Sequence, residues 1–298
     1  MKVFYSDRYT VPLPPGHRFP MQKYRKIRHA LLQSATLRPD HLEEPEEPGF
    51  AELIKAHDPS FVSAFLEGRL DGRSMRRIGF PWSRELVGRI LTTVGGSLSA
   101  AFHALDYGIA GNLAGGTHHA GASTGEGFCV FNDVAVACRN LWDAHPGLRI
   151  AILDLDVHQG NGNAELLADD ERIFIVSVHG EKNYPFERVH SHLDIGLPDG
   201  ATDEVYIKVV ASVLPEVFEF QPDIVMYQAG VDGLKSDTLG RLSLTHGGLK
   251  RRDEIVLSEC REREIAVSLA LGGGYADPIE DTVQAHVGTY RAVRELFG

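Results

Sequence analysis

Short apolar runs alternate along the chain with longer segments of helical character, most regularly in its second half. The runs are apolar at consecutive positions, which is typical of parallel strands buried between two layers of helices. Strands are predicted at Lys2–Tyr5, Arg149–Asp154, Ile173–Val178, Asp223–Gln228 and Ile265–Leu271. Helices are predicted at Gln22–Ser34, Ala51–His57, Pro59–Gly68, Arg84–Leu105, Ala164–Leu167, Glu204–Phe218, Gly247–Arg263 and Pro278–Phe297, with a surface loop at Leu37–Gly49. The alternation predicts an α/β fold, a single domain over residues 1–298 with three layers (α/β/α) and a mainly parallel central sheet.

Composition narrows the class of protein further. The 298 residues are 43% hydrophobic and 24% charged, as in ordinary globular domains, which excludes a disordered or coiled-coil chain. Acidic residues outnumber basic ones by 41 to 30, for a net charge of −11, so we expect no nucleic-acid partner. This charge is still compatible with a local acidic rim that attracts cationic substrates. Three cysteines make no disulfide framework, and no segment has the pattern of a signal peptide or a membrane span, so a cytoplasmic location without a membrane span is the expectation.

Polar clusters follow four of the predicted strands directly. They are Asp154–His158, Ser177–His179, Gln228–Asp232 and Gly272–Tyr275. Because the carboxyl ends of parallel strands meet at one edge of a sheet, where ligands bind, these side chains are predicted to gather there. Packing gives no reason for an apolar strand to end in two aspartates and a histidine.

Asp156, His158 and Asp232 form a candidate metal-binding set. Asp156 and His158 are two residues apart, so on an extended strand both would face the same side, and Asp232 arrives from another strand end. One imidazole and two carboxylates leave a metal with an open position for water. Zinc is the first expectation, and the donor set also suits Fe(II), Co(II) or Mn(II). The alternative is that these residues cap helices and solvate strand ends.

Two further features carry candidate chemistry. The adjacent His118 and His119 lie in a loop of small residues and could supply a base and a neighbouring electrostatic group, although such a pair can also be a surface feature. Tyr275 follows three glycines and could donate a hydrogen bond to a polarised carbonyl. The glycines alone could instead form a plain turn, and no phosphate-binding pattern is present.

The segment Gly121–Gly125 matches the Gly-x-Ser-x-Gly pattern of serine hydrolases. That nucleophile elbow needs a strand directly before the serine and a helix directly after it. No strand is predicted before Ser123, so the segment is interpreted as a loop beside the pocket. Cys129, Cys138 and Cys260 are interpreted as buried apolar thiols.

Taken together and in order, the motifs GGTHHA, GFCVFNDVAVA, LDLDVHQGNG, VSVHG, QAGVDGLKSDTLG and LALGGGY resemble the histone deacetylase superfamily. They extend from Gly115 to Tyr275. The segments Pro14–Pro20 and His179–Phe186 are more similar to class IV enzymes and their bacterial relatives than to class I. The resemblance implies the arginase–deacetylase fold and a zinc-dependent amidohydrolase that removes acyl groups from lysine side chains.

The resemblance also implies a role for individual residues. Asp156, His158 and Asp232 would bind zinc, His119 would act as general base and then general acid, and His118 would stabilise the transition state. Tyr275 would polarise the amide carbonyl, and Asp154 and Asn161 would orient the two histidines. A structural potassium ion would be bound through Asp154, Asp156, His158, Ser177 and Val178. The acyl-lysine tunnel would be lined by Gly127, Phe128, Tyr184, Leu239 and Gly273.

One position departs from the class I pattern, which has aspartate where this chain has Asn161. A neutral amide stabilises an imidazolium less than a carboxylate does, so His119 is expected to be less basic; class II and IV members share this asparagine.

The sequence therefore predicts a lysine deacylase acting on acyl-lysine in proteins or peptides, with acetyl or longer fatty acyl groups. An acetylpolyamine or other small-amide deacetylase and a non-catalytic acyl-lysine-binding module are the alternatives. A monomer is compatible with the sequence, which leaves the oligomeric state open.

Overall fold

The computed structural model describes all 298 residues. Eight strands form one sheet in the order β2-β1-β3-β8-β7-β4-β5-β6. Their bounds are β1 (Lys2–Phe4), β2 (Leu42–Glu43), β3 (Ile109–Asn112), β4 (Ile150–Asp154), β5 (Ile173–Gly180), β6 (Leu193–Leu197), β7 (Ile224–Gln228) and β8 (Ala266–Ala270). Every neighbouring pair is parallel, so the predicted mainly parallel sheet is confirmed and has no antiparallel strand.

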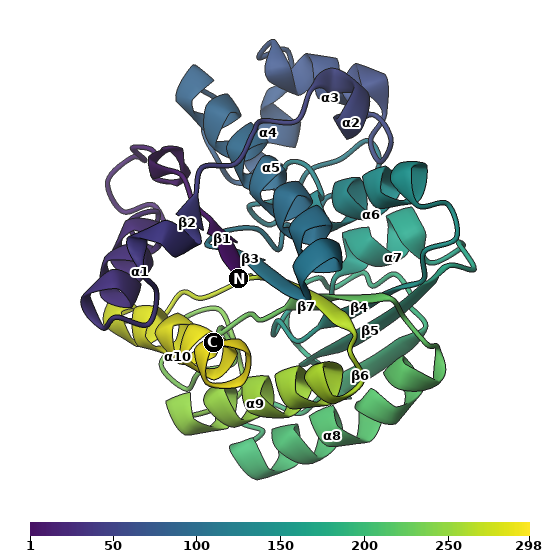
Figure 1. Cartoon of the computed structure of the whole chain (residues 1–298). Helices are drawn as coiled ribbons and strands as arrows, with labels where there is room; N and C mark the ends of the chain where they lie inside the picture. Colours follow the sequence, from purple (N-terminus) through teal and green to yellow (C-terminus); the bar gives the residue numbers. More distant parts are fainter.

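Helices cover both faces of this sheet (Figure 1). One layer consists of α5 (Arg84–Tyr107), α6 (Asp133–Ala144) and α7 (Asn161–Leu167), and the other consists of α1 (Lys23–Gln33), α8 (Asp203–Glu219), α9 (His246–Glu262) and α10 (Ile279–Phe297). Three short helices, α2 (Phe50–Leu53), α3 (Pro59–Leu66) and α4 (Gly72–Ile78), lie near one end of α5. The predicted three-layer α/β/α architecture is therefore confirmed. No helix combines the length and the apolar character that crossing a membrane requires.

The central strands are apolar on both faces because each face packs into a different core. In β4, Ile150 and Ile152 belong to one buried cluster, and Ala151 and Leu153 belong to the other. All four side chains have no exposed surface. Consecutive side chains of a strand point to opposite faces, so every side chain of a strand between two helix layers is buried and apolar residues are favoured at each position.

The long helix α5 shows how local sequence sets the bounds of an element. The side chain of Ser83 caps it by accepting the N–H of Leu86 at 3.0 Å. It ends at Tyr107, and the residue that follows is Gly108, whose φ of +85° favours glycine. A Cβ at Gly96 would lie 2.5 Å from the hydroxyl oxygen of Tyr9, so this glycine lets the N-terminal segment pack closely against the helix.

The sequence prediction omitted several elements that the structure contains. They are α4, α6 and the strands β3 and β6, together with β2, which lies inside the predicted loop Leu37–Gly49. The predicted helix Ala51–His57 is wrong in extent, because α2 is a single turn that ends at Leu53. The strand β6 lies at the edge of the sheet and is half exposed, so it lacks the fully apolar pattern that identified the buried strands.

Candidate active site

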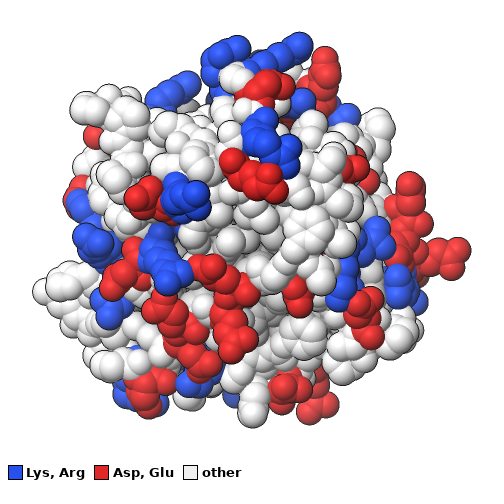
Figure 2. All heavy atoms as spheres, turned by 90° about the horizontal axis from the view of Figure 1, so that it is seen from above, with Lys and Arg blue, Asp and Glu red and all other residues white.

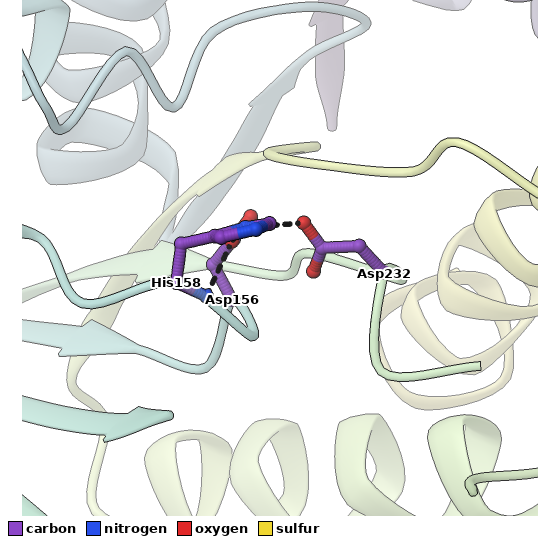
Figure 3. Close-up of side chains that lie close together, drawn as sticks. All are labelled: Asp156, His158 and Asp232. Carbon is purple, nitrogen blue, oxygen red and sulfur yellow. Dashed lines mark hydrogen bonds and ion pairs between the residues drawn. The ribbon is translucent and has the colours of Figure 1, made fainter. Parts of the chain in front are cut away.

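Three ligand-type side chains meet in one buried site beyond the carboxyl ends of the strands (Figure 3). His158 Nδ1 lies 3.0 Å from Asp156 Oδ1 and 3.1 Å from Asp232 Oδ2. One candidate ligand atom from each residue lies within 4.8 Å of the other two. The spacing predicts that Asp156 and His158 face the same side of an extended strand, and this prediction is wrong. The strand β4 ends at Asp154, and both residues lie in the loop beyond it.

Backbone N–H groups hold the two carboxylates in place. Asp232 Oδ1 accepts the N–H of Val157 at 2.9 Å, and Asp156 Oδ2 accepts the N–H of Gly273 at 2.7 Å. Each carboxylate therefore keeps its other oxygen for the cluster. A Cβ at Gly273 would lie 1.8 Å from Asp232 Oδ2, so glycine is required where the chain passes this closely. One imidazole nitrogen and two carboxylate oxygens, all buried, make a donor set that fits Zn²⁺ and also Fe²⁺ or Co²⁺.

The charges of this cluster need a cation. Burial raises the pKa of Asp232 to about 7, and the negative charge of Asp156 adds to that effect. Burial acts to lower the pKa of His158, but hydrogen bonds to both carboxylates outweigh it and raise that pKa to about 10. In the metal-free protein the imidazolium thus neutralises part of the carboxylate charge. This contribution to stability is complete below the unfolded pKa of 6.5 and is lost as the pH rises through about 10.

The adjacent histidines lie beside the cluster, and each contacts a different partner. His118 Nδ1 lies 2.7 Å from Asp154 Oδ2, and His119 Nδ1 lies 2.7 Å from Asn161 Oδ1. Burial opposes a charge on His118, but the carboxylate of Asp154 outweighs burial and raises its pKa. Burial lowers the pKa of His119 well below its usual range, and the positive charges of His118 and His158 add to this. His119 is therefore neutral and free to accept a proton at Nε2.

A chain of side chains that sequence analysis missed continues from Asn161 to the protein surface. The Nδ2 group of Asn161 donates to Glu126 Oε1 at 2.7 Å, and Glu126 Oε2 accepts from Nε of Arg77 at 2.6 Å. Glu126 is buried, whereas the side chain of Arg77 is about half exposed. Because the amide nitrogen of Asn161 faces this carboxylate, its oxygen faces His119 and fixes the ring with a proton on Nδ1.

We expect Glu126→Gln to lower kcat by about tenfold, the low end of the effect of groups that orient a ligand or base. Glutamine can donate as well as accept, so Asn161 loses the charge that fixes its amide. Loss of the buried negative charge also makes an imidazolium at His119 less stable, so the acidic limb of the pH–rate profile should move to lower pH. Exposed Glu262 at the end of α9 provides the control variant, Glu262→Gln. Unchanged kcat and an unchanged pH profile in Glu126→Gln would contradict this role.

Tyr275 lines the same inner pocket as Asp156, His158 and the histidine pair. Asp237, another residue that sequence analysis missed, fixes its backbone by accepting the N–H of Tyr275 at 2.6 Å. The phenol ring packs near Phe19 and Phe128, with centroid separations of 6.0 and 6.1 Å, and the Nζ atom of Lys23 lies 5.0 Å from its centroid. Burial raises the pKa of Tyr275 well above its usual range, so the hydroxyl stays protonated and can donate.

The residues predicted to bind potassium are buried in β4, β5 and the loop after β4. They are Asp154, Asp156, His158, Ser177 and Val178. Asp154 and Ser177 are direct neighbours across β4 and β5, and Ser177 Oγ lies 2.9 Å from His179 Nδ1. This arrangement brings the five residues into one region, and the potassium site stays a prediction.

A cavity of about 490 Å³ leads from the surface to His119, His158 and Tyr275. Four of the five predicted tunnel residues line it, namely Gly127, Phe128, Tyr184 and Leu239. The fifth, Gly273, lines a smaller inner pocket of about 40 Å³ next to Asp156. A Cβ at Gly127 would lie 2.8 Å from the ring of His119, and the neighbouring Phe128 has a φ of +68°. The wall beside the base is therefore a tight and strained turn.

The Gly-x-Ser-x-Gly segment forms a loop, as predicted. No strand precedes Ser123 and no helix follows it directly, and its side chain is exposed. This arrangement excludes a nucleophile elbow. The three cysteines are all buried and free, as predicted.

Comparison with known proteins agrees with this geometry. The histone deacetylase domain family matches residues 17–290. The chain belongs to the histone deacetylase family. It is 43% identical over 296 residues to an uncharacterized protein of Picosynechococcus sp., with 99% of each chain covered. It is 29% identical to histone deacetylase 2 of Arabidopsis thaliana, covering 92% of this chain and 74% of that protein.

Histone deacetylase 1 of Homo sapiens is 30% identical over 284 residues, and the match covers 87% of this chain but 58% of the human protein. The chain thus spans little more than half the length of that relative. Among solved structures, the crystal structure of the HDA15 HD domain superposes with a TM-score of 0.82 at 22% identity, covering 99% of this chain and 88% of that one. This superposition confirms the predicted arginase–deacetylase fold, and the family match confirms the predicted histone deacetylase resemblance.

Proposed function

We propose that this histone deacetylase family member is a zinc-dependent deacylase that hydrolyses the amide of acyl-lysine in proteins or peptides. The observation that supports it best is the meeting of three groups in one buried site: the Asp156–His158–Asp232 cluster, a neutral His119, and the protonated phenol of Tyr275. The similarity of the sequence to class IV enzymes, a structural potassium ion and a preference for longer fatty acyl groups belong to the same proposal.

Asp156, His158 and Asp232 would hold the metal. The chemistry that a divalent ion would supply when bound there is polarisation of an acyl carbonyl and a lower pKa of a water molecule. His119 takes a proton from the attacking water at Nε2, because the hydrogen bond of Nδ1 to Asn161 leaves that nitrogen free. The same nitrogen then gives the proton to the leaving lysine amine.

The remaining side chains act on the developing charge. The hydroxyl of Tyr275 donates a hydrogen bond to the carbonyl oxygen as negative charge builds on it. His118, held by Asp154 at 2.7 Å, carries positive charge beside the base and stabilises the same state electrostatically. The cavity wall formed by Phe128 and Tyr184 excludes water from the alkyl chain of the substrate lysine.

The test is hydrolysis of one peptide that carries lysine acylated with chains from acetyl to myristoyl, with metal analysis of the same protein sample. We expect release of the free acid from at least one member and about one bound transition-metal ion per chain. If every member is untouched while an N-acetylated polyamine is cleaved, the protein-deacylase proposal fails and the small-amide alternative replaces it.

A further inference from the structure

Basic side chains surround the mouth of the 490 Å³ cavity. They are Arg18, Arg77, Lys182 and Arg241, which we call the basic rim. No aspartate or glutamate lines the cavity, although Glu181 and Glu187 belong to the same loop as Lys182. The four residues come from segments far apart in the sequence, so only the fold brings them together.

The basic rim has more positive charge than its neighbours neutralise. Arg77 is paired with the buried Glu126. Lys182 and Arg241 share one carboxylate, that of Asp199, at 3.8 and 3.3 Å, and their side chains are 68% and 54% exposed. Arg18 is exposed and forms no ion pair. Four cations therefore face two carboxylates, and neither carboxylate lines the cavity.

This excess is unusual for the molecule. The chain has a net charge of −11, so a rim of average composition would be acidic. Over the face seen in Figure 2, basic groups lie next to acidic ones and form no large surface of one sign. A cluster of one sign around the entrance to the active site therefore points to selection of what enters it, since a cleft lined by one charge attracts the opposite one.

We infer that the basic rim selects acyl-lysine substrates whose neighbouring residues are aspartate or glutamate. The inference rests on the proposed function and adds the class of peptide. When an acylated lysine enters the cavity its side chain is neutral, so recognition by charge falls on the residues beside it. These are spaced about 3.3 Å apart in an extended peptide, close enough for several to contact the rim. A protonated polyamine would be repelled by the same rim.

The experiment compares three peptides with the same acyl-lysine and with acidic, neutral or basic flanking residues. We expect kcat/KM for the acidic peptide to exceed that for the basic peptide by about tenfold, mainly through a lower KM. Several exposed charge pairs acting together account for an effect of this size. The preference should fall to about threefold or less in 0.5 M salt, because exposed charges are screened. Binding of the same peptides with a fluorescent label is measured in parallel, so that rim selectivity is visible without turnover.

The double variant Arg18→Gln, Arg241→Gln should lose most of this preference while it hydrolyses the neutral peptide within about twofold of the original rate. The control is Arg291→Gln, which removes an exposed charge in α10, a helix that contributes no residue to the cavity. Equal binding of the three peptides, or a preference for the basic one, overturns the inference. Selective binding of the acidic peptide without hydrolysis of any peptide supports the rim and overturns the proposed deacylase function instead.

Discussion

Removal of the divalent ion with a chelator is expected to abolish amide hydrolysis, and added Zn²⁺ is expected to restore it. The reason is the charge of the site: Asp156 and Asp232 are at most 1% exposed, and no Lys or Arg side chain forms an ion pair with either of them. In the absence of metal, a proton on His158 offsets them, with a further contribution from His118, whose Nε2 lies 3.9 Å from Asp156 Oδ1. Hydrolysis should recover in proportion to bound zinc, measured by metal analysis of the same samples.

The affinity for metal should also depend on pH in a defined direction. The imidazole must lose its proton before it can bind a metal, and in the metal-free protein its pKa is about 10. Between pH 8 and 9, above the pKa of Asp232 near 7, about one proton is therefore released for each ion bound, and the apparent affinity should rise about tenfold per pH unit. Competition against a chelator of known affinity at pH 7, 8 and 9 measures this slope. An affinity independent of pH would mean that His158 does not bind the ion.

A ligand substitution separates this explanation from general damage to the fold. Asp232→Asn removes a charge but keeps an oxygen that can accept the N–H of Val157. We expect metal affinity to fall by more than the ~10–100-fold that loss of an outer partner causes. Asp106→Asn, at an exposed position of α5, is the matched control. If Asp232→Asn binds zinc as tightly as the unaltered protein does, the assignment of Asp232 as a ligand is wrong.

An element of this fold can be predicted from the sequence when the pattern that identifies it lies in consecutive residues, and it is missed when the element depends on partners that are distant in the chain. The strands β4, β7 and β8 are evident because both faces are buried, and the polar residues after them stand out against that apolar background. The strand β3 has only four residues, one of them Gly111, and it ends in Asn112, a residue that usually marks a turn. Asn112 is tolerated there because Tyr9, Thr93 and Ser97 satisfy its side chain. No local pattern predicts those partners.

The same distinction applies to the site. The cluster and the histidine pair lie in short motifs, whereas Glu126 and Arg77 are 49 positions apart and each resembles an ordinary surface charge. The basic rim depends on four distant segments, and net charge even suggests the opposite sign. The helix α6 is different, because Asn132 caps it at 2.8 Å and an apolar periodicity follows, so attention to caps would have found it.

Replacement of Tyr275 by phenylalanine is expected to lower kcat by about 10²–10³-fold while leaving peptide binding nearly unchanged. Only backbone atoms of Tyr275 hydrogen-bond within the protein, so its hydroxyl is free for the substrate. Burial raises the pKa of the phenol well above its usual range, and the charges of Asp232 and Asp156 add to this, so the donor proton is kept at neutral pH. A group that acts on charge in the transition state affects kcat more than KM.

This substitution also decides between an enzyme and a module that only binds acyl-lysine. Phenylalanine keeps the ring contacts with Phe19 and Phe128, so a binding module would be unaffected by loss of the hydroxyl. Tyr107→Phe, at a side chain that is 69% exposed, controls for removal of a hydroxyl elsewhere. Peptide affinity from labelled-peptide titration and kcat from the acid released are measured on the same preparation. Equal turnover by Tyr275→Phe and the unaltered protein would show that the hydroxyl of Tyr275 is not needed for the reaction.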